Sequence, residues 1–325
     1  MTNEILSKLE NRKFKRNYSP PEESVIFSIS DQATRKTHVI GSLCSFVTFV
    51  GLPKAGKSLY ITSAIASAFT TWDIFGMKIN FPPGRKRLAY IDTESSDFDF
   101  YKVLDRIRSQ IICNQLPDNF DAFLFREDPP HDIQQMIENY LINSPECSVL
   151  VIDGILDLIA DFNSVEQSFY LVQWLKQITK RFNLLLLCVL HLGKKDQHSI
   201  GHIGSFLDRK SQSVLIVQKN KEQKTIDLLP GMLRSTDDFN PLQIQHNGNQ
   251  WNQVNASPQT ETDHVYGMEK KQILYKILAE PKGYNQLVVD LSEFTGKSLT
   301  TCKKILRKWI QEETIRKVGD LYKMA

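Results

Sequence analysis

Gly51-Leu52-Pro53-Lys54-Ala55-Gly56-Lys57-Ser58 is the stretch that decides the fold. It matches the pattern G-x-x-x-x-G-K-[ST] without departure. An apolar run at residues 46–50 precedes it, and a stretch with helical periodicity follows it. A strand, a glycine-rich turn and a helix in this order are the context that the pattern requires. The sequence therefore predicts a phosphate-binding loop between a buried strand and a helix.

The residue types in this loop suit a triphosphate. Two glycines let the backbone curl so that successive N–H groups point at phosphate oxygens, and the next helix adds the positive end of its dipole. We expect Lys57 to reach the β- and γ-phosphates and the Ser58 hydroxyl to ligate Mg²⁺. Lys54 either touches phosphate, in its own or a neighbouring subunit, or is simply solvated. The predicted cofactors are ATP and Mg²⁺, and the predicted binding residues are Gly51, Leu52, Pro53, Lys54, Ala55, Gly56, Lys57, Ser58 and Leu59.

Short apolar runs alternate with helical stretches along most of the chain. Nearly continuous runs of this length are typical of strands that are buried on both faces. The pattern predicts an α/β domain with a mostly parallel sheet over residues 24–247. The predicted strands are 46–50, 88–91, 122–125, 149–152, 184–190 and 214–217, and the predicted helices are 61–69, 100–112, 133–141 and 169–178.

Polar side chains follow three of the predicted strands. Since the carboxyl ends of parallel strands line the ligand crevice, we predict that Asp153 holds the magnesium ion together with Ser58. Glu94 follows another strand, where a carboxylate can orient and deprotonate the attacking water. We prefer it to Asp92 because its side chain is longer; the alternative is that Glu94 caps the next helix. His191 either senses the γ-phosphate or is an ordinary structural histidine.

Composition excludes several classes of protein. Apolar residues make up 41% of the 325 residues, enough for a full core, and the net charge is only +3. The five cysteines are scattered without paired spacing, which suggests reduced thiols. The polar N-terminus has no apolar signal region, and the longest apolar run is too short to span a bilayer. We therefore expect a cytoplasmic protein without membrane contact.

The chain changes character toward its C-terminus. We interpret residues 1–23 as a flexible arm and 248–266 as a linker. Residues 267–325 show three helical stretches, at 269–280, 285–294 and 300–311, then two short strands around a tight turn at 315–323, which together predict a winged helix-turn-helix domain.

This small predicted domain carries much of the positive charge. It has twelve Lys and Arg side chains against seven Asp and Glu side chains. A basic helix at the recognition position favours contact with duplex DNA. The alternative is a domain that binds only protein and has solvated lysines. The predicted DNA contacts on this helix are Lys303, Lys304, Arg307 and Lys308.

Several motifs occur in the order of a known family. They are 51–58, Tyr90 to Glu94, Val151 to Gly154, Val189 to Lys194 and Gly204 to Lys210. In these motifs the chain resembles the RecA-like ATPases, in particular the hexameric replicative helicases of plasmids and related ATPases of mobile elements. The resemblance covers residues 24–247.

The resemblance implies roles for individual residues. Glu94 looks like the catalytic base and His191 like the sensor. The segment from Lys194 to Gly204, with Lys194 and Lys195, looks like a loop that touches single-stranded DNA in a central channel. Lys219, Arg209 or Lys210 looks like the cation that reaches the γ-phosphate of a neighbouring subunit, which would make hydrolysis depend on assembly.

Two hypotheses of function remain. In the first, the protein is an ATP-dependent motor on single-stranded or duplex DNA. It forms a homo-oligomeric ring, expected to be a hexamer, and acts as a helicase with replication or mobilisation proteins. In the second, it is an ATP-switched DNA-binding or partner-recruiting regulator that does not unwind DNA. A small-molecule kinase is a third, weaker alternative, because no lid-like arginine cluster accompanies the loop.

Overall fold

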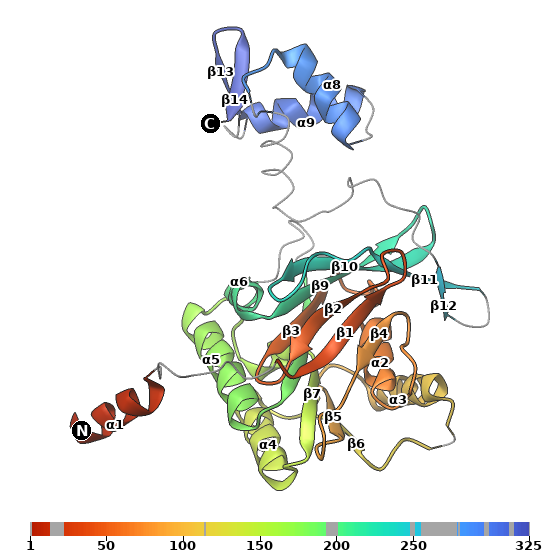
Figure 1. Cartoon of the computed structure of the whole chain (residues 1–325), viewed down its shortest axis with the longest axis vertical. Coiled ribbons are helices and arrows are strands. Elements are labelled where there is room, and N and C mark those ends of the chain that lie inside the picture. The colour runs from red at the N-terminus through yellow and green to blue at the C-terminus, as the bar shows by residue number, and fades with distance from the viewer. Residues whose placement is uncertain are drawn as a thin grey trace.

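The computed structural model describes residues 2–13, 23–113, 115–192, 201–247, 251–254, 278, 280–295, 299–311 and 315–324. A large α/β unit contains the phosphate-binding loop, and a small unit lies at the C-terminal end of the chain (Figure 1).

A nine-stranded sheet forms the centre of the α/β unit. Its strands are β3 (Phe46–Gly51), β5 (Arg87–Asp92), β6 (Phe120–Leu124), β7 (Cys147–Asp153), β8 (Leu185–His191), β9 (Ser213–Asn220), β10 (Thr225–Leu233), β11 (Leu242–His246) and β12 (Trp251–Val254). They lie in the order β12-β11-β10-β9-β3-β8-β7-β5-β6. The six strands from β9 to β6 in this order run parallel, and β10, β11 and β12 extend the sheet as antiparallel strands. The predicted α/β fold with a mostly parallel sheet is confirmed.

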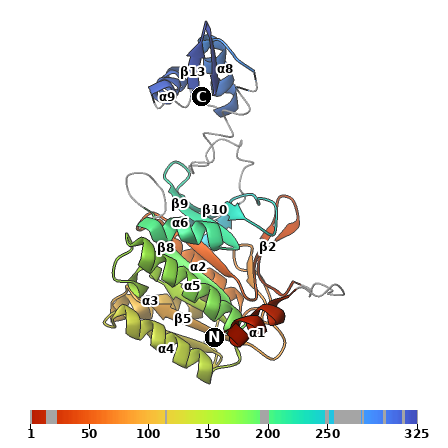
Figure 2. The same ribbon diagram turned by 90° about the vertical axis from the view of Figure 1, so that its left-hand side faces the viewer.

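Helices cover both faces of this sheet (Figure 2). They are α2 (Lys57–Ser67), α3 (Asp97–Ile111), α4 (Pro130–Asn143), α5 (Val165–Arg181) and α6 (Gly201–Lys210). Along β7, Val149 and Val151 face the core cluster that contains α2 and α3 residues, and Leu150 and Ile152 face the cluster that contains α4, α5 and α6 residues. Side chains alternate between the faces of a strand, so a strand covered on both faces is apolar throughout.

A second, three-stranded sheet packs on the α2 side. It has the order β2-β1-β4 and consists of β1 (Val25–Asp31), β2 (Lys36–Ser42) and β4 (Met77–Ile79). Phe27, Ile40 and Met77 are fully buried and join the same core cluster as α2. Our sequence analysis placed these residues inside the domain but did not predict the strands.

Four further features differ from the sequence prediction. Residues Thr2–Arg12 of the expected arm form a helix, α1, and Ile155–Leu158 form a short 3-10 helix, η1. The expected domain boundary at residue 247 is too early, because β12 pairs with β11 and extends the sheet to Val254. The predicted DNA-contacting loop ends before Gly201, since Gly201–Lys210 is helical; the part at 193–200 lies outside the described residues.

The C-terminal unit contains α8 (Tyr284–Thr295), α9 (Leu299–Gln311) and a hairpin of β13 (Ile315–Val318) and β14 (Leu321–Met324). These elements lie where the sequence predicted two helices and two short strands. Leu287, Leu306 and Trp309 are buried in a separate core cluster. The predicted first helix lies almost entirely outside the described residues, so the winged-helix interpretation stays a prediction. Within the described ranges, no helix has the length and apolar character needed to cross a membrane.

Candidate active site

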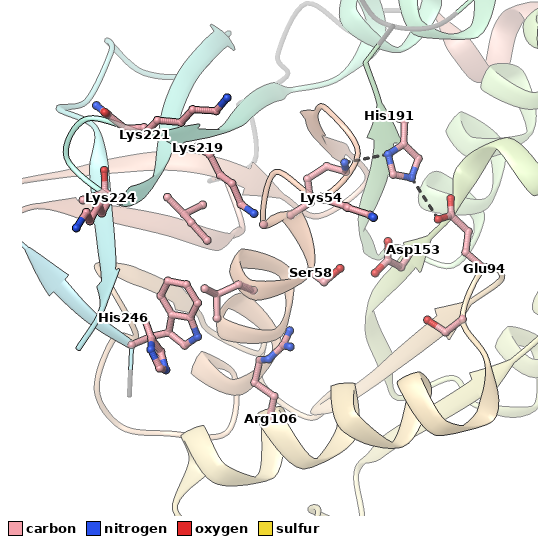
Figure 3. Close-up of a pocket in the computed structure, with 18 of the residues that line it drawn as sticks. Lys54, Ser58, Glu94, Arg106, Asp153, His191, Lys219, Lys221, Lys224 and His246 are labelled. Atoms are coloured by element: carbon pink, nitrogen blue, oxygen red, sulfur yellow. Dashed lines mark hydrogen bonds and ion pairs between the residues drawn. The ribbon is translucent and has the colours of Figure 1, made fainter. Parts of the chain in front are cut away.

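Strand register brings the predicted site residues together at one edge of the sheet. Gly51 at the end of β3 lies beside His191 at the end of β8, and Asp92 at the end of β5 lies beside Asp153 at the end of β7. The side chains of Glu94, Asp153 and His191 converge next to the phosphate-binding loop (Figure 3). Residues that are distant in the sequence therefore form one polar cluster.

The loop backbone needs both of its glycines. Gly56 has a φ of +103°, and a Cβ atom on it would lie 2.7 Å from the Ile226 side chain. A Cβ atom on Gly51 would lie 2.4 Å from the carbonyl oxygen of Val217. Ser58, in the first turn of α2, is exposed. This tight curl at the start of a helix is the arrangement that binds phosphate through backbone N–H groups, so the residues fit the triphosphate that the motif predicts.

Lys57 is buried and held by three hydrogen bonds. Its ammonium group donates to the carbonyl oxygens of Gly51 (2.9 Å) and Leu52 (3.0 Å) and to Nδ1 of His191 (3.0 Å). Burial lowers the pKa of Lys57 to about 8, against the attraction of Asp153 and Glu94. These contacts hold the ammonium group beside the backbone of the loop.

His191 connects Lys57 to Glu94. Because Lys57 donates to Nδ1, that nitrogen must be the acceptor, so the proton of a neutral imidazole lies on Nε2. Nε2 lies 3.2 Å from a carboxylate oxygen of Glu94 and donates to it. This hydrogen bond lowers the pKa of Glu94, and the charge of Lys57 contributes less. The result is a continuous Lys57–His191–Glu94 chain across the end of the sheet.

Asp92, the alternative to Glu94, has a different position. One of its oxygens accepts the backbone N–H groups of Glu94 (3.0 Å) and Ser95 (2.8 Å), and the other accepts the Tyr90 hydroxyl (3.1 Å). It therefore fixes the turn that carries Glu94. The alternative in which Glu94 caps α3 is wrong, because the N-cap is Ser96, whose side chain accepts the N–H of residue 99.

Asp153 lies at the end of β7, beside two other carboxylates. Burial, together with the smaller effect of the negative charges of Asp92 and Glu94, raises its pKa to about 7. The Tyr90 hydroxyl donates to it at 3.3 Å. A divalent cation would compensate this crowded negative charge. With the exposed Ser58 hydroxyl nearby, the donors are the oxygen atoms that Mg²⁺ prefers, so the residues present fit this ion.

The site opens into a pocket of about 630 Å³. Lys219 lines the pocket of its own chain (Figure 3), although the resemblance implied contact with a neighbouring subunit. Arg106 of α3 also lines it and was missed by the sequence analysis, because no motif marks this arginine on its helix. The other lining residues that were not predicted are Ser95, Asn220, Lys221, Lys224, Thr225, Ile226, His246 and Trp251.

The remaining predicted residues lie elsewhere. Arg209 is exposed near the end of α6, does not line this pocket, and accepts a hydrogen bond from Arg234 through its carbonyl oxygen. Lys303 and Arg307 are exposed on α9. Lys194 and Lys195, and the side chains of Lys304 and Lys308, lie outside the described residues.

A parallel sheet, a phosphate-binding loop after β3 and an acidic strand end beside it define a P-loop ATPase. The comparison with protein families agrees with this class. The family model described as "AAA domain" matches residues 19–197, more than half of the chain, so the protein belongs to this family of P-loop ATPases. A comparison with curated proteins finds none that matches the chain.

Proposed function

We propose that the protein is an ATP-driven motor on DNA that assembles as a homo-oligomeric ring, a hexamer, and acts as a helicase. The Lys57–His191–Glu94 chain is the observation that carries the proposal, because it joins the phosphate-binding lysine to a carboxylate through one side chain at a third strand end. Such a link lets a change at the γ-phosphate reach β8 and the segment after it. ATP hydrolysis then drives movement of the neighbouring DNA-contacting parts.

The roles of the site residues are part of the proposal. Lys57 binds the β- and γ-phosphates, and Ser58 and Asp153 hold Mg²⁺, which polarises the phosphate oxygens when bound. Glu94 accepts a proton from the attacking water. His191 senses the γ-phosphate indirectly, because Lys57, which binds this phosphate, donates to its Nδ1.

Lys219 and Arg209 are the two main candidates for the cation that stabilises negative charge on the γ-phosphate during hydrolysis. Lys219 lies in the pocket of its own chain and can act in cis. Arg209 is exposed on α6, so it is available to a neighbouring subunit. Mixing Arg209→Ala subunits with Lys57→Ala subunits distinguishes them. If Arg209 acts in trans, the mixture should be active although each variant alone is inactive, because a Lys57→Ala subunit supplies its Arg209 to the intact pocket of an Arg209→Ala neighbour. If Lys219 acts in cis instead, Arg209→Ala subunits should be active alone.

Measurement of the molecular mass in solution tests whether the chain assembles and whether assembly requires the nucleotide and DNA. The full chain is measured by light scattering alone, with Mg-ATP, and with Mg-ATP and single-stranded DNA. A discrete oligomer that requires the nucleotide supports the ring. A strand-displacement assay on a forked duplex is the second step; a monomer under every condition, or no displacement with ATP, argues against the motor.

The second candidate is an ATP-switched DNA-binding regulator. The exposed cations Lys303 and Arg307 on α9, in a unit with its own core, favour it. DNA affinity that changes with bound nucleotide, without displacement of a strand, would support this candidate over the motor.

A further inference from the structure

The pocket has two ends, on opposite sides of β3 in the sheet. Asp153, Glu94 and His191 belong to β7, to the turn after β5 and to β8, all on one side of β3. On the other side, β10, β11 and β12 supply Thr225, Ile226, His246 and Trp251. If the γ-phosphate faces the carboxylates, as the proposed function requires, the sugar and base of the nucleotide extend toward β10, β11 and β12. This placement of the base rests on the proposed function.

Trp251 is positioned at this second end. It is the first residue of β12 and is paired with His246 of β11, and their ring centroids are 5.0 Å apart with an interplanar angle of 63°. The indole is half-buried and packs against the core cluster that includes Leu59 and Ile226. Strand pairing and packing therefore fix a large aromatic side chain in the wall of a nucleotide-sized pocket.

The fixed polar groups beside Trp251 serve the protein itself. The side-chain carbonyl oxygen of Asn220 accepts the backbone N–H groups of residues 222 (3.1 Å) and 223 (3.0 Å). The Thr225 hydroxyl donates to the carboxylate of Asp227 at 2.6 Å. Lys221 and Lys224 lie on the exposed turn between β9 and β10. Specific recognition of a base edge needs donors and acceptors in fixed positions, whereas the Asn220 oxygen and the Thr225 hydroxyl are already engaged by the protein.

We propose that Trp251 forms a nucleobase subsite that selects purine triphosphates by stacking area and does not separate adenine from guanine. Every base has a π-face, and a purine covers more of an indole than a pyrimidine does. Stacking of a base on an aromatic side chain is tolerant of base identity for this reason.

Titration calorimetry of the full-length wild-type chain is the first test. The ligands are ATP, GTP, CTP and inorganic tripolyphosphate, each with magnesium. ATP and GTP should bind within about fivefold of each other, and CTP should bind about tenfold more weakly than ATP. Tripolyphosphate should bind more weakly than CTP, because it has the phosphates without any base to stack. GTP binding about a hundredfold weaker than ATP would overturn the proposal.

Variants of the tryptophan provide the second test. Trp251→Ala should weaken ATP binding roughly 5- to 150-fold, the range of a lost stacking contact, and leave tripolyphosphate binding unchanged. Trp251→Phe should keep most of the ATP affinity. Trp72→Ala is the matched control, since Trp72 is exposed and does not line the pocket. Unchanged ATP affinity in Trp251→Ala would overturn the proposal.

Tryptophan emission gives a readout that needs no turnover. ATP should change the emission of the wild-type chain more than tripolyphosphate does, and this difference should disappear in Trp251→Phe. The outcomes also separate the two proposals. If the wild-type chain binds neither ATP nor tripolyphosphate, the proposed function fails. If it binds ATP and Trp251 has no effect, the nucleobase subsite alone is wrong.

Discussion

Glu94 is the residue at this site with the most specific proposed role, that of the general base. Asp92 fixes its backbone, and the His191 Nε2–H hydrogen bond keeps its pKa low, so it is ionised and oriented at neutral pH. Glu94→Gln should retain ATP affinity and lower the turnover number by about 10²- to 10⁴-fold, the usual contribution of a general base. Calorimetry and phosphate release measure the two effects. Glu127→Gln, on an exposed residue, is the control; near-normal turnover in Glu94→Gln contradicts the base assignment.

Two shifted pKa values predict opposite proton movements on binding Mg-ATP. Asp153 has a pKa of about 7 in the free protein, and a bound cation favours its carboxylate, so a proton should leave at pH 6.5. Lys57 has a pKa of about 8, and phosphate favours its ammonium form, so a proton should be taken up at pH 8.5.

Calorimetry in buffers with different ionisation enthalpies measures this proton exchange. Net release should turn into net uptake as the pH rises from 6.5 to 8.5. In Asp153→Asn the release at low pH should be lost. The same sign of exchange at both pH values would show that these two groups do not control the linkage.

The sequence could predict the residues at the strand ends but not their pairing. A pattern that ends an apolar run in Asp153 or His191 places each side chain at the crevice. The His191 contact with Lys57 depends on the register of Gly51 beside His191, which is set by packing of the whole sheet. Trp251 lay in a stretch that resembled a linker, and a bulky aromatic among polar residues was the signal available to find it.

At the scale of elements, the strands that could be predicted from the sequence are those whose side chains are apolar without interruption. Strands buried on both faces, such as β3 and β8, are apolar throughout. β1 and β2 bury polar side chains and therefore lack that pattern. On β2, Nδ1 of His38 lies 3.0 Å from both the Thr236 hydroxyl and the Asp237 carbonyl oxygen. Partners about two hundred residues away cannot be recognised from a local sequence pattern.

Arg85 joins three turns at the edge of the sheet opposite the pocket. Its guanidinium donates to the carbonyl oxygens of Pro145 (3.0 Å), Cys147 (2.5 Å), Phe182 (2.7 Å) and Asn183 (2.5 Å). Arg85→Ala removes these bonds and should lower the free energy of unfolding by about 2–3 kcal/mol.

Urea denaturation measures this change, and ATP affinity of the folded variant should stay at the wild-type value. Arg126→Ala is the matched control, because Arg126 is exposed, and it should change the unfolding free energy by less than about 0.5 kcal/mol. Equal stability of the two variants would mean that water hydrates the four carbonyl groups without any loss of unfolding free energy when the Arg85 side chain is removed.

At the scale of the whole molecule, the exposed cations of α9 test whether DNA binding and ATP hydrolysis reside in different units. Lys303 and Arg307 are exposed, and Leu306 of the same helix is buried, so reversing the two charges leaves the core of the C-terminal unit intact. The double variant Lys303→Glu/Arg307→Glu should bind duplex DNA more weakly than the wild-type chain. Its log–log salt slope should be shallower by about 2, because each lost phosphate contact contributes about 0.9.

The matched control reverses two charges outside that unit. Lys36 and Lys176 are exposed on β2 and α5, so Lys36→Glu/Lys176→Glu changes the net charge equally. Fluorescence anisotropy across a salt series should show the shallower slope only in the α9 variant, and basal ATP hydrolysis without DNA should equal that of the wild-type chain in both. Equal slopes in the two variants would mean that DNA affinity depends on the overall charge of the protein. A specific contact by α9 requires the slope of the α9 variant to be shallower than that of the control variant.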